Sequence, residues 1–337
     1  MRFSGKKIFS RIAAAVLLVV VPMLILVGYA QSPVGRDIPL RTVDIPRGAS
    51  FSRVMDLLEA EGLLRQRELF HLLALLRNGT RQIRAGEYEF SGRMSPSEIL
   101  GKLIRGDVKG YHITVPEGFT AREILGRLLA TKLVDEKEFL RLSRNREFLS
   151  TLGIEGISLE GYLFPETYIL DRSMDTRTII RTMVNQFWHH VTPSMRKRSA
   201  DLGLTVDQWV TLASIIEKET GRKEEMPLIA AVFHNRLKRR MPLQSDPTVI
   251  YGMADFDGNL RKQDLLKKTP YNTYLFAGLP PGPIASPGLD ALQAALYPTD
   301  VAYLYFVSKN DGSHQFSDDL SQHSKAVQKY QLQNRKP

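Results

Sequence analysis

The longest apolar element that the hydropathy pattern predicts lies near the N-terminus. Residues 12–30 form an uncharged run of 19 residues, which as an α-helix would extend about 28 Å, close to the roughly 30 Å hydrocarbon thickness of a bilayer. We therefore predict one transmembrane helix over 12–30. Four basic residues lie in the preceding tail, 1–11, and the first acidic residue after the run is Asp37. The positive-inside rule then places the tail in the cytoplasm and the rest of the chain outside.

A cleaved signal peptide is the alternative interpretation of this segment. Gly28 and Ala30 provide small residues where a signal peptidase would cleave. The apolar run exceeds the usual ~7–15 residues of a signal-peptide core, which favours a retained anchor. Both interpretations export the remainder. Residues 31–42 contain Pro and Gly without helical periodicity, so we predict an extended spacer there.

An internal repeat follows the spacer. Residues 43–58 (VDIPRGASFSRVMDLL) return seventy positions later as residues 113–128 (ITVPEGFTAREILGRL). Each copy predicts a short strand, a Pro-x-Gly turn, a Ser or Thr cap and an amphipathic helix.

The first copy opens a small predicted module over 43–108. A further strand is expected at 85–90, and a second helix begins at Pro96 with Ser95 as its N-cap. A strand, two helices and a strand in about 65 residues make a βααβ unit, which is the shape of a LysM glycan-binding module. A structural spacer domain explains the pattern equally well, because shape alone does not establish binding.

The remaining residues, 109–337, alternate helices with short strands and form the larger predicted domain. Helical spacing occurs at 122–133, 136–149, 174–189, 205–220 and 226–240, and strand patterns occur at 162–170 and 302–309. Asn310-Asp-Gly is a hairpin turn that leads into 314–317. We predict the α+β class.

Composition and charge exclude several classes of function. The chain of 337 residues has 43% hydrophobic and 24% charged residues, as ordered globular proteins do. It has no Cys, which excludes disulfides, thiolate zinc sites and a cysteine nucleophile. The net charge is +10, but the basic residues are scattered and form no stripe with aromatic residues, which argues against a nucleic-acid groove. Metalloprotease, nucleotide-binding and serine-hydrolase motifs do not occur.

Glu217 is the candidate acid. The helix predicted over 205–220 begins with a capping box, which sets its register. At 100° per residue Glu217 projects between Val206 and Val210, inside the apolar face of the helix. An apolar environment raises the pKa of a carboxyl group, as a general acid near neutral pH requires. A buried Glu217 paired with Arg236 or another cation fits the spacing equally well.

Glu219 falls toward Gln208 and Leu212, a more polar edge of the same helix.

Sugar-binding residue types flank this helix in sequence. Residues 160–168, 244–251 and 270–274 are rich in Tyr, Gln, Asn and Asp. Tyr rings stack on pyranose rings, and the amide and carboxyl groups bind hydroxyl and acetamido groups. Each Tyr taken singly is more often a core residue.

Six motifs in order resemble the YceG-like endolytic murein transglycosylases. They are LEGYLFPETY over 159–168, LASIIEKET over 212–220, FHNRL over 233–237, LQSDPT over 243–248, YNTY over 271–274 and GLPPGPIASPG over 278–288. The resemblance runs from the predicted anchor to about residue 332. The C-terminal part departs from the family pattern: His314-Gln-Phe-Ser317 is present, but Asp319, Gln322 and Ser324 stand near His323 where the family has a Thr and then Glu-His-Asn.

The resemblance implies one membrane helix, a LysM-like module and a catalytic domain over 109–337 in the periplasm, attached to the cytoplasmic membrane. Glu217 matches the family's catalytic glutamate. The implied reaction is non-hydrolytic cleavage of the β-1,4 bond between N-acetylmuramic acid and N-acetylglucosamine, which leaves 1,6-anhydro ends and releases or terminates nascent strands. Peptidoglycan strands, the membrane and cell-wall synthesis proteins are the implied partners, with no nucleic acid, metal or cofactor.

The candidate substrate contacts lie in the matching motifs. They are Glu166, Tyr168, Arg236, Gln244, Asp246, Tyr251, Tyr271 and Asn272, with Glu166 and Arg236 as orienting groups and Glu219 and His314 as secondary candidates. Two other functions stay open. A hydrolytic muramidase needs a second carboxylate, such as Asp246, to activate water. In a non-catalytic glycan-binding scaffold Glu217 is structural.

Overall fold

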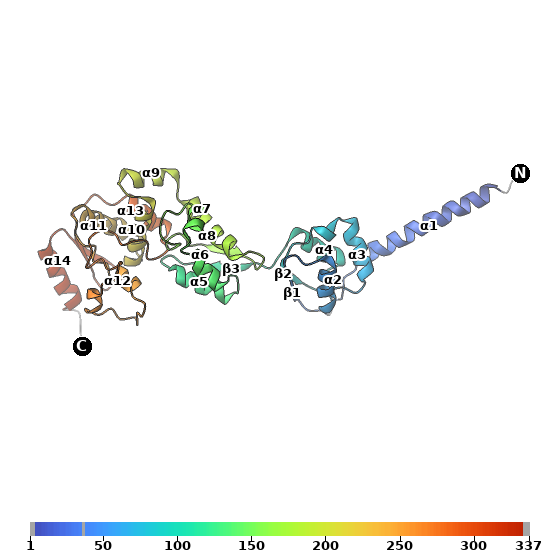
Figure 1. Cartoon of the computed structure of the whole chain (residues 1–337), viewed down its shortest axis with the longest axis horizontal. Coiled ribbons are helices and arrows are strands. Elements are labelled where there is room, and N and C mark those ends of the chain that lie inside the picture. The colour runs from blue at the N-terminus through green and yellow to red at the C-terminus, as the bar shows by residue number, and fades with distance from the viewer. Residues whose placement is uncertain (1–3, 36–37, 333–337) are drawn as a thin grey trace. The chain divides into compact units, whose positions relative to one another are not determined.

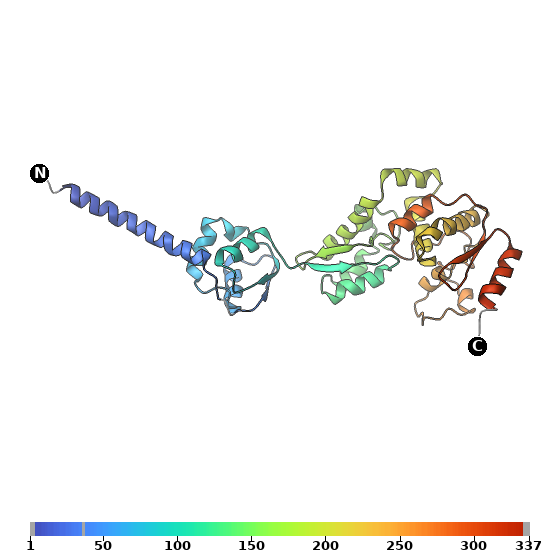
Figure 2. The same cartoon turned by 180° about the vertical axis from the view of Figure 1, so that it is seen from behind.

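The computed structural model describes residues 4–35 and 38–332, with side chains from Val16 onward. The predicted spacer over 31–42 therefore includes two residues, 36–37, outside the described part. The described chain divides into two compact units (Figures 1 and 2). The first comprises the described residues up to Tyr111 together with Leu170–Met174; the second comprises His112–Ile169 and the described residues from Asp175 onward.

The first unit packs helices around one antiparallel strand pair. Strand β1 (Arg41–Ile45) pairs with β2 (Gly86–Phe90), with Val43 opposite Tyr88. Alternate residues of β1 are buried, as the period of two requires. The other elements of this unit are α1 (Ser4–Gln31), α2 (Phe51–Ala60), α3 (Arg67–Leu76), the 3₁₀ turn η1 (Gly79–Arg81) and α4 (Pro96–Arg105).

The strand–helix–helix–strand order occurs in this unit, with one correction. The second helix of the βααβ order is α3, whereas the helix predicted at Pro96 is α4 and follows β2. Ser95 caps α4 as predicted: its hydroxyl accepts from Glu98 N–H, and the Glu98 side chain accepts from Ser95 N–H. Such reciprocal bonds satisfy two of the free donors at a helix start.

Helix α1 covers the run that predicts a membrane span. Over the described residues, no helix is long and apolar enough to cross a bilayer. The side chains of 12–15 lie outside the described part. From Val16 onward most large apolar side chains of α1 are exposed, while Leu26 and Ala30 near its end are buried in the core of the first unit.

The second unit is built mainly of helices, with two short strand pairs. Strand β3 (Tyr111–Thr114) pairs with β4 (Thr167–Leu170); one end residue of each, Tyr111 and Leu170, is assigned to the first unit. Strand β5 (Tyr305–Ser308) pairs antiparallel with β6 (His314–Ser317). Its α-helices are α5 (Ala121–Ala130), α6 (Glu136–Leu142), α7 (Arg146–Thr151), α8 (Thr176–His190), α9 (Pro193–Asp201), α10 (Val206–Glu219), α11 (Met226–Lys238), α12 (Asp246–Tyr251), α13 (Leu289–Leu296) and α14 (Leu320–Val327). Short 3₁₀ turns lie at Lys223–Glu225 (η2) and Asp264–Leu266 (η3), and a π-helical turn lies at Gln328–Leu332 (η4). The predicted α+β class is confirmed.

Two elements of the second unit differ from their prediction for local reasons. The helix predicted over 136–149 is two helices, because α6 ends at Leu142 and the Asn145 side chain caps the start of α7. The strand predicted over 162–170 is shortened to β4, because residues 160–165 form a buried turn in which Gly161 has a φ of +84°.

Helix α10 is the centre of the second unit. It begins at the predicted capping box of Thr205 and Gln208. It packs against α11 and α13, and the fully buried Trp209 donates its indole N–H to Leu292 O of α13 at 2.9 Å. The loop over 278–288 covers the other side: Ile284 N–H donates to Ser214 Oγ at 3.0 Å. This packing fixes the end of α10, where Glu217 lies.

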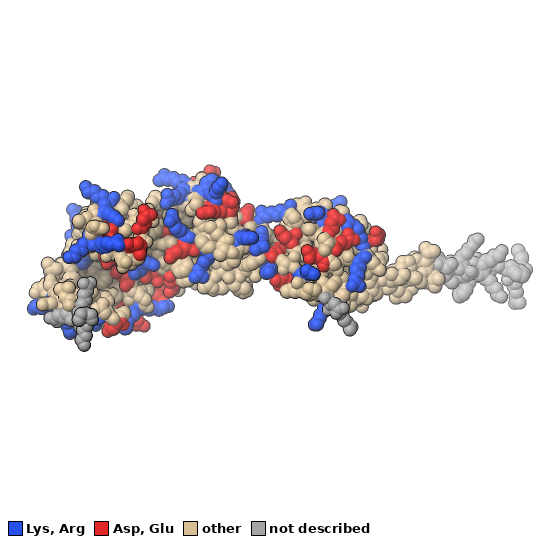
Figure 3. Space-filling model, turned by 90° about the horizontal axis from the view of Figure 1, so that it is seen from below, with Lys and Arg blue, Asp and Glu red and all other residues tan. Residues whose placement is uncertain are grey.

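Charged side chains are mixed on the surface. On the face shown in Figure 3, Lys and Arg side chains are interspersed with Asp and Glu side chains over both units. This matches the scattered charge pattern of the sequence.

Candidate active site

Glu217 lies in the last turn of α10 and is partly buried. Its Oε2 accepts a hydrogen bond from the backbone N–H of Gly288 at 2.9 Å. Burial raises the pKa of Glu217; the Gly288 hydrogen bond opposes this shift and the charge of Glu117 adds to it. The group therefore keeps its proton closer to neutral pH than an ordinary Glu, which suits a general acid.

A second carboxylate, Glu117, lies beside this hydrogen bond. A Cβ atom added to Gly288 would lie 2.0 Å from Glu117 Oε1, so both carboxyl groups lie close to the Gly288 backbone. The negative charge of Glu117 disfavours ionisation of Glu217. Sequence analysis missed Glu117, although the Pro-x-Gly turn of the second repeat contains it.

The turn that carries Glu117 is joined to both neighbouring segments. Gly118 N–H donates to Ser286 O at 2.9 Å, and Ser286 N–H donates to Phe119 O at 2.7 Å. Lys218 Nζ donates to Gly118 O at 3.1 Å. Strand β3, helix α10 and the loop over 278–288 therefore meet at Glu217.

Glu219, predicted at a more polar edge of the helix, has polar neighbours but a covered carboxyl group. Its Oε1 accepts a 2.5 Å hydrogen bond from Ser245 Oγ. Burial raises the pKa of Glu219 to about 7; the Ser245 bond and the charge of Arg236 oppose this shift, and the charge of Asp246 adds to it. The residue is partly accessible, but its carboxyl end is covered by residues 243–246. The prediction rested on residue spacing within α10, which gives no information about the loop that covers this carboxyl group.

Arg236 does not pair with Glu217, so the alternative that pairs Glu217 with Arg236 is wrong. The guanidinium is buried and donates to Leu304 O at 2.7 Å, to Leu243 O at 2.9 Å and to Gln244 Oε1 at 3.2 Å. A further bond to Pro242 O at 3.2 Å, together with those to Leu243 and Gln244, holds residues 242–244 in place. Arg236 therefore orients the loop that carries Gln244.

Two predicted tyrosines form a second group around a buried acid. Tyr251 OH donates to Glu160 Oε2 at 3.0 Å, and the rings of Tyr251 and Tyr271 are 4.8 Å apart. Glu160 Oε1 accepts from Ala121 N–H at 2.9 Å. Burial raises the pKa of Glu160 to about 7, although these hydrogen bonds oppose the shift. Sequence analysis missed Glu160, whose only signal was its place in the LEGYLFPETY motif.

Two other predicted contacts are structural residues. Tyr168 is buried and donates its hydroxyl to Phe164 O at 2.6 Å. Asn272 is 1% exposed; its amide donates to Leu265 O and Lys267 O at 3.0 and 2.8 Å. Neither side chain is accessible to a substrate, because the backbone around it uses its polar atoms.

Three predicted contacts are exposed. Glu166 accepts from Gln186 Nε2 at 3.5 Å, at the edge of α8. Gln244 has a positive φ of +50° and Asp246 accepts from Tyr274 OH at 2.6 Å. Asp246 lies near Glu219, as its effect on the pKa of that residue shows.

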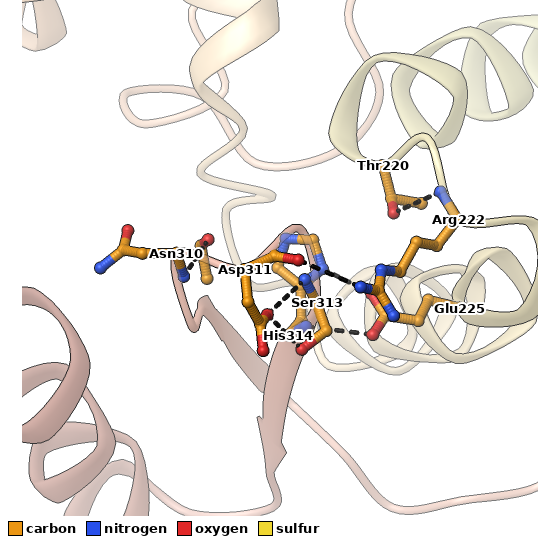
Figure 4. A network of polar contacts seen from close by, with 8 residues as sticks. Thr220, Arg222, Glu225, Asn310, Asp311, Ser313 and His314 are labelled. Atoms are coloured by element: carbon orange, nitrogen blue, oxygen red, sulfur yellow. Dashed lines mark hydrogen bonds and ion pairs between the residues drawn. The ribbon is translucent and has the colours of Figure 1, made fainter.

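His314, at the start of β6, contacts the segment that follows α10 (Figure 4). Its Nδ1 is 2.6 Å from Glu225 Oε2, and its backbone N–H donates to Glu225 Oε1 at 3.0 Å. Arg222 Nη2 donates to Asp311 O at 3.0 Å, which holds the tip of the β5–β6 hairpin to the same segment. His314 therefore fixes the hairpin. Among the described side chains, no group of three or more His, Asp or Glu residues is arranged to hold a metal ion.

The chain that carries this site matches one known protein family. The sequence profile described as the YceG-like family matches residues 43–329. The chain belongs to the YceG-like family. The matched region contains Glu217, Glu117 and all the candidate contacts described above.

Curated relatives of this YceG-like chain carry one name. A Bacillus subtilis protein named endolytic murein transglycosylase is 34% identical over 310 residues, which cover 86% of this chain and 84% of that protein. A Streptococcus pneumoniae protein of the same name is 30% identical over 318 residues; the match covers 85% of this chain and 57% of that longer protein. A crystal structure of a putative yceG-like protein from Listeria monocytogenes aligns with a TM-score of 0.59 and 32% identity, covering 85% of this chain and 98% of that one.

Proposed function

We propose that this protein is an endolytic peptidoglycan lytic transglycosylase whose catalytic acid is Glu217. The observation that carries the proposal is the partly buried carboxyl group with a raised pKa, fixed by Gly288 N–H at the end of α10. The names of the Bacillus and Streptococcus relatives support the same reaction class.

One carboxyl group is sufficient for this reaction. Glu217 donates its proton to the glycosidic oxygen that leaves C1 of N-acetylmuramic acid. The resulting carboxylate then accepts the proton of the C6 hydroxyl as that oxygen closes on C1, so a 1,6-anhydro ring forms and Glu217 regains its proton. The Gly288 N–H bond stabilises the charged intermediate form of Glu217.

The hydrolytic alternative now depends on a different residue. A muramidase needs a second carboxylate to activate water or to act as nucleophile. Asp246, the residue predicted for this role, is bound to Tyr274 OH and lies near Glu219. The charge of Glu117 acts on Glu217 more strongly than that of the other nearby carboxylate, Asp290, so Glu117 is the candidate base in that mechanism.

Product analysis separates the candidate functions. The full chain is incubated with purified peptidoglycan strands and the products are analysed by mass spectrometry. A lytic transglycosylase yields 1,6-anhydromuramic ends, a muramidase yields reducing ends, and a glycan-binding scaffold yields no product. Reducing ends as the main product would overturn the proposal.

We propose further that the catalytic domain, 109–337, is periplasmic and anchored to the cytoplasmic membrane through residues 12–30, close to the synthesis of new strands. The support is the uncharged run of 19 residues behind a basic tail. The LysM-like module over 43–108 would then hold strands near the membrane. A reporter fused after Pro337 that is active only in the cytoplasm would contradict the topology, and a mature N-terminus at Gln31 would contradict the retained anchor.

A further inference from the structure

A groove runs along the exposed side of α13 in the second unit. Its volume is about 610 Å³. The lining comes from the end of α8, the start of α9 and one face of α13, and consists of His189, His190, Thr192, Ser194, Met195, Leu289, Gln293 and Tyr297. None of these side chains belongs to the candidate contacts around Glu217.

The groove adjoins the candidate active site at the start of α13. Leu289, at one end of the lining, directly follows Gly288, whose N–H binds Glu217. On the other wall the ring of His190 stacks on Phe164, with centroids 4.3 Å apart and planes inclined by 13°. Phe164 lies in the LEGYLFPETY motif. Helix α13 is about 12 Å long, so Tyr297 at its far end lies roughly one such length from the Gly288–Glu217 contact.

The chemistry of the lining suits a sugar polymer. Tyr297 is 54% exposed and offers an aromatic surface for stacking on a pyranose ring. Gln293, Ser194 and Thr192 offer amide and hydroxyl groups for sugar hydroxyl and acetamido groups.

The charge next to the groove suits an anionic ligand. Helix α9 carries Arg196, Lys197 and Arg198 in succession, and the Arg198 guanidinium lies 5.5 Å from the centroid of the Tyr297 ring. Peptidoglycan carries carboxylates on its stem peptides, or on the lactyl groups of strands that lack them, and this positive charge attracts such groups.

We propose that the groove along α13 binds the peptidoglycan strand beyond the sugars that react at Glu217, with Tyr297 as a stacking platform. The inference rests on the substrate class given under the proposed function. An enzyme that cuts inside a strand binds sugars on both sides of the broken bond, and this groove supplies a binding surface on one of those sides.

Substrate length tests the inference. The full-length wild-type chain and the variants Tyr297→Ala and Tyr297→Phe are compared on long uncrosslinked glycan strands and on a tetrasaccharide. Tyr297→Ala is expected to lower kcat/KM for long strands about tenfold, the effect of losing roughly 1.4 kcal/mol of stacking. The tetrasaccharide should be cut at the wild-type rate, because it does not reach Tyr297. Tyr297→Phe keeps the ring and should behave as wild type.

A control and a binding measurement complete the test. Leu140→Ala removes an exposed apolar side chain on α6 (52% exposed) and should change neither substrate's rate. Affinity for fluorescently labelled strands is measured in the Glu217→Gln background with and without Tyr297→Ala. Equal strand affinities with and without Tyr297→Ala would overturn the proposed role of the groove. An equal loss of kcat/KM on long strands and on the tetrasaccharide would also overturn it. Absence of anhydro products from the wild type together with strand binding that depends on Tyr297 would overturn the proposed reaction and leave the groove in place.

Discussion

The two copies of the internal repeat adopt the same local structure in different surroundings. In each copy a strand is followed by a Pro-x-Gly turn whose glycine, Gly48 or Gly118, has a φ of +74°. A side chain two residues later, Ser50 or Thr120, caps the following helix by accepting a backbone N–H. Only glycine adopts this φ readily, so the same four or five residues produce the same turn in both units.

The copies differ in what packs against the turn. A Cβ atom added to Gly48 would meet no atom within 4 Å, whereas one added to Gly118 would lie 3.5 Å from the Lys218 side chain and 3.7 Å from that of Glu217. The residue before the glycine is Arg47 in the first copy, which donates to Ser173 O, and Glu117 in the second. Local sequence determines the strand, turn and helix, and packing onto α10 gives only the second copy a place at the site.

The largest expected effect comes from replacing the carboxyl group next to the second copy. Glu217→Gln keeps the shape but cannot donate a proton, so release of 1,6-anhydro muropeptides should fall by at least ~10²-fold. The fold should be unchanged or slightly more stable, because burying an ionisable carboxyl group costs stability. Mass spectrometry of the products and thermal unfolding measure the two effects.

Glu219→Gln is the matched control for Glu217→Gln, two residues away on the same helix. Its amide retains a hydrogen-bonding partner for Ser245, so we expect a clearly smaller loss of activity. A folded Glu217→Gln protein with near wild-type activity would contradict the mechanism. A larger defect in Glu219→Gln would identify Glu219, whose pKa is also raised, as the acid.

The next largest effect is expected when the residue before the glycine is replaced by Gln in each of the two turns. Burial and the charge of Glu117 both raise the pKa of Glu217, and the acid step needs Glu217 protonated. Glu117→Gln removes that charge, so the alkaline limb of the kcat/KM profile should move to lower pH and activity at neutral pH should fall severalfold. Arg47→Gln, at the same repeat position, should leave the profile unchanged. An unshifted limb in Glu117→Gln would show that the charge of Glu117 does not act on Glu217.

Structural features that depend on residues close together in the chain could be predicted from the sequence. The N-cap at Ser95 and the capping box at Thr205 set the starts of two helices, and the apolar face of α10 indicated that Glu217 is desolvated. Both features follow from spacing within one helix.

Contacts between distant segments were not predictable in this way. Burial of the Glu219 carboxyl depends on Ser245, and Glu117 reaches Gly288 only because two loops pack together. Asn272 looked like a sugar contact because its residue type binds both sugars and backbone carbonyls, and only the fold shows that it binds the latter. Residue type and motif identify a candidate, whereas accessibility decides its role.

A smaller effect is expected at the helix that follows the second turn. Glu160 accepts from Ala121 N–H at the start of α5, and burial raises its pKa from 4.5 to about 7. The folded state therefore binds this proton more tightly than the unfolded state, so the stability from Glu160 is fully present below 4.5 and is lost as the pH rises through 7.

Glu160→Gln should remove this pH dependence. Above pH 7 the variant should have a Tm a few degrees higher than the wild type, since one pKa unit corresponds to about 1.4 kcal/mol. Below pH 4.5 the two proteins should unfold at similar temperatures. Thermal unfolding by circular dichroism across this range measures the difference. A variant that is equally destabilised at both ends of the range would show that Glu160 acts through its hydrogen bonds alone.

The smallest expected effect separates stability from function in the two copies. Ser50→Ala and Thr120→Ala each remove one N-cap, which costs about 1 kcal/mol of stability. Ser50→Ala should leave kcat on short strands unchanged, because α2 lies in the first unit. Thr120→Ala should also lower kcat by a few fold, because the cap fixes the start of α5 next to Phe119, whose carbonyl accepts from Ser286 N–H beside Gly288. Unfolding temperature and initial rate are measured for both proteins at a temperature well below unfolding, and equal rates in the two variants would show that the second turn tolerates local loosening without disturbing Glu217.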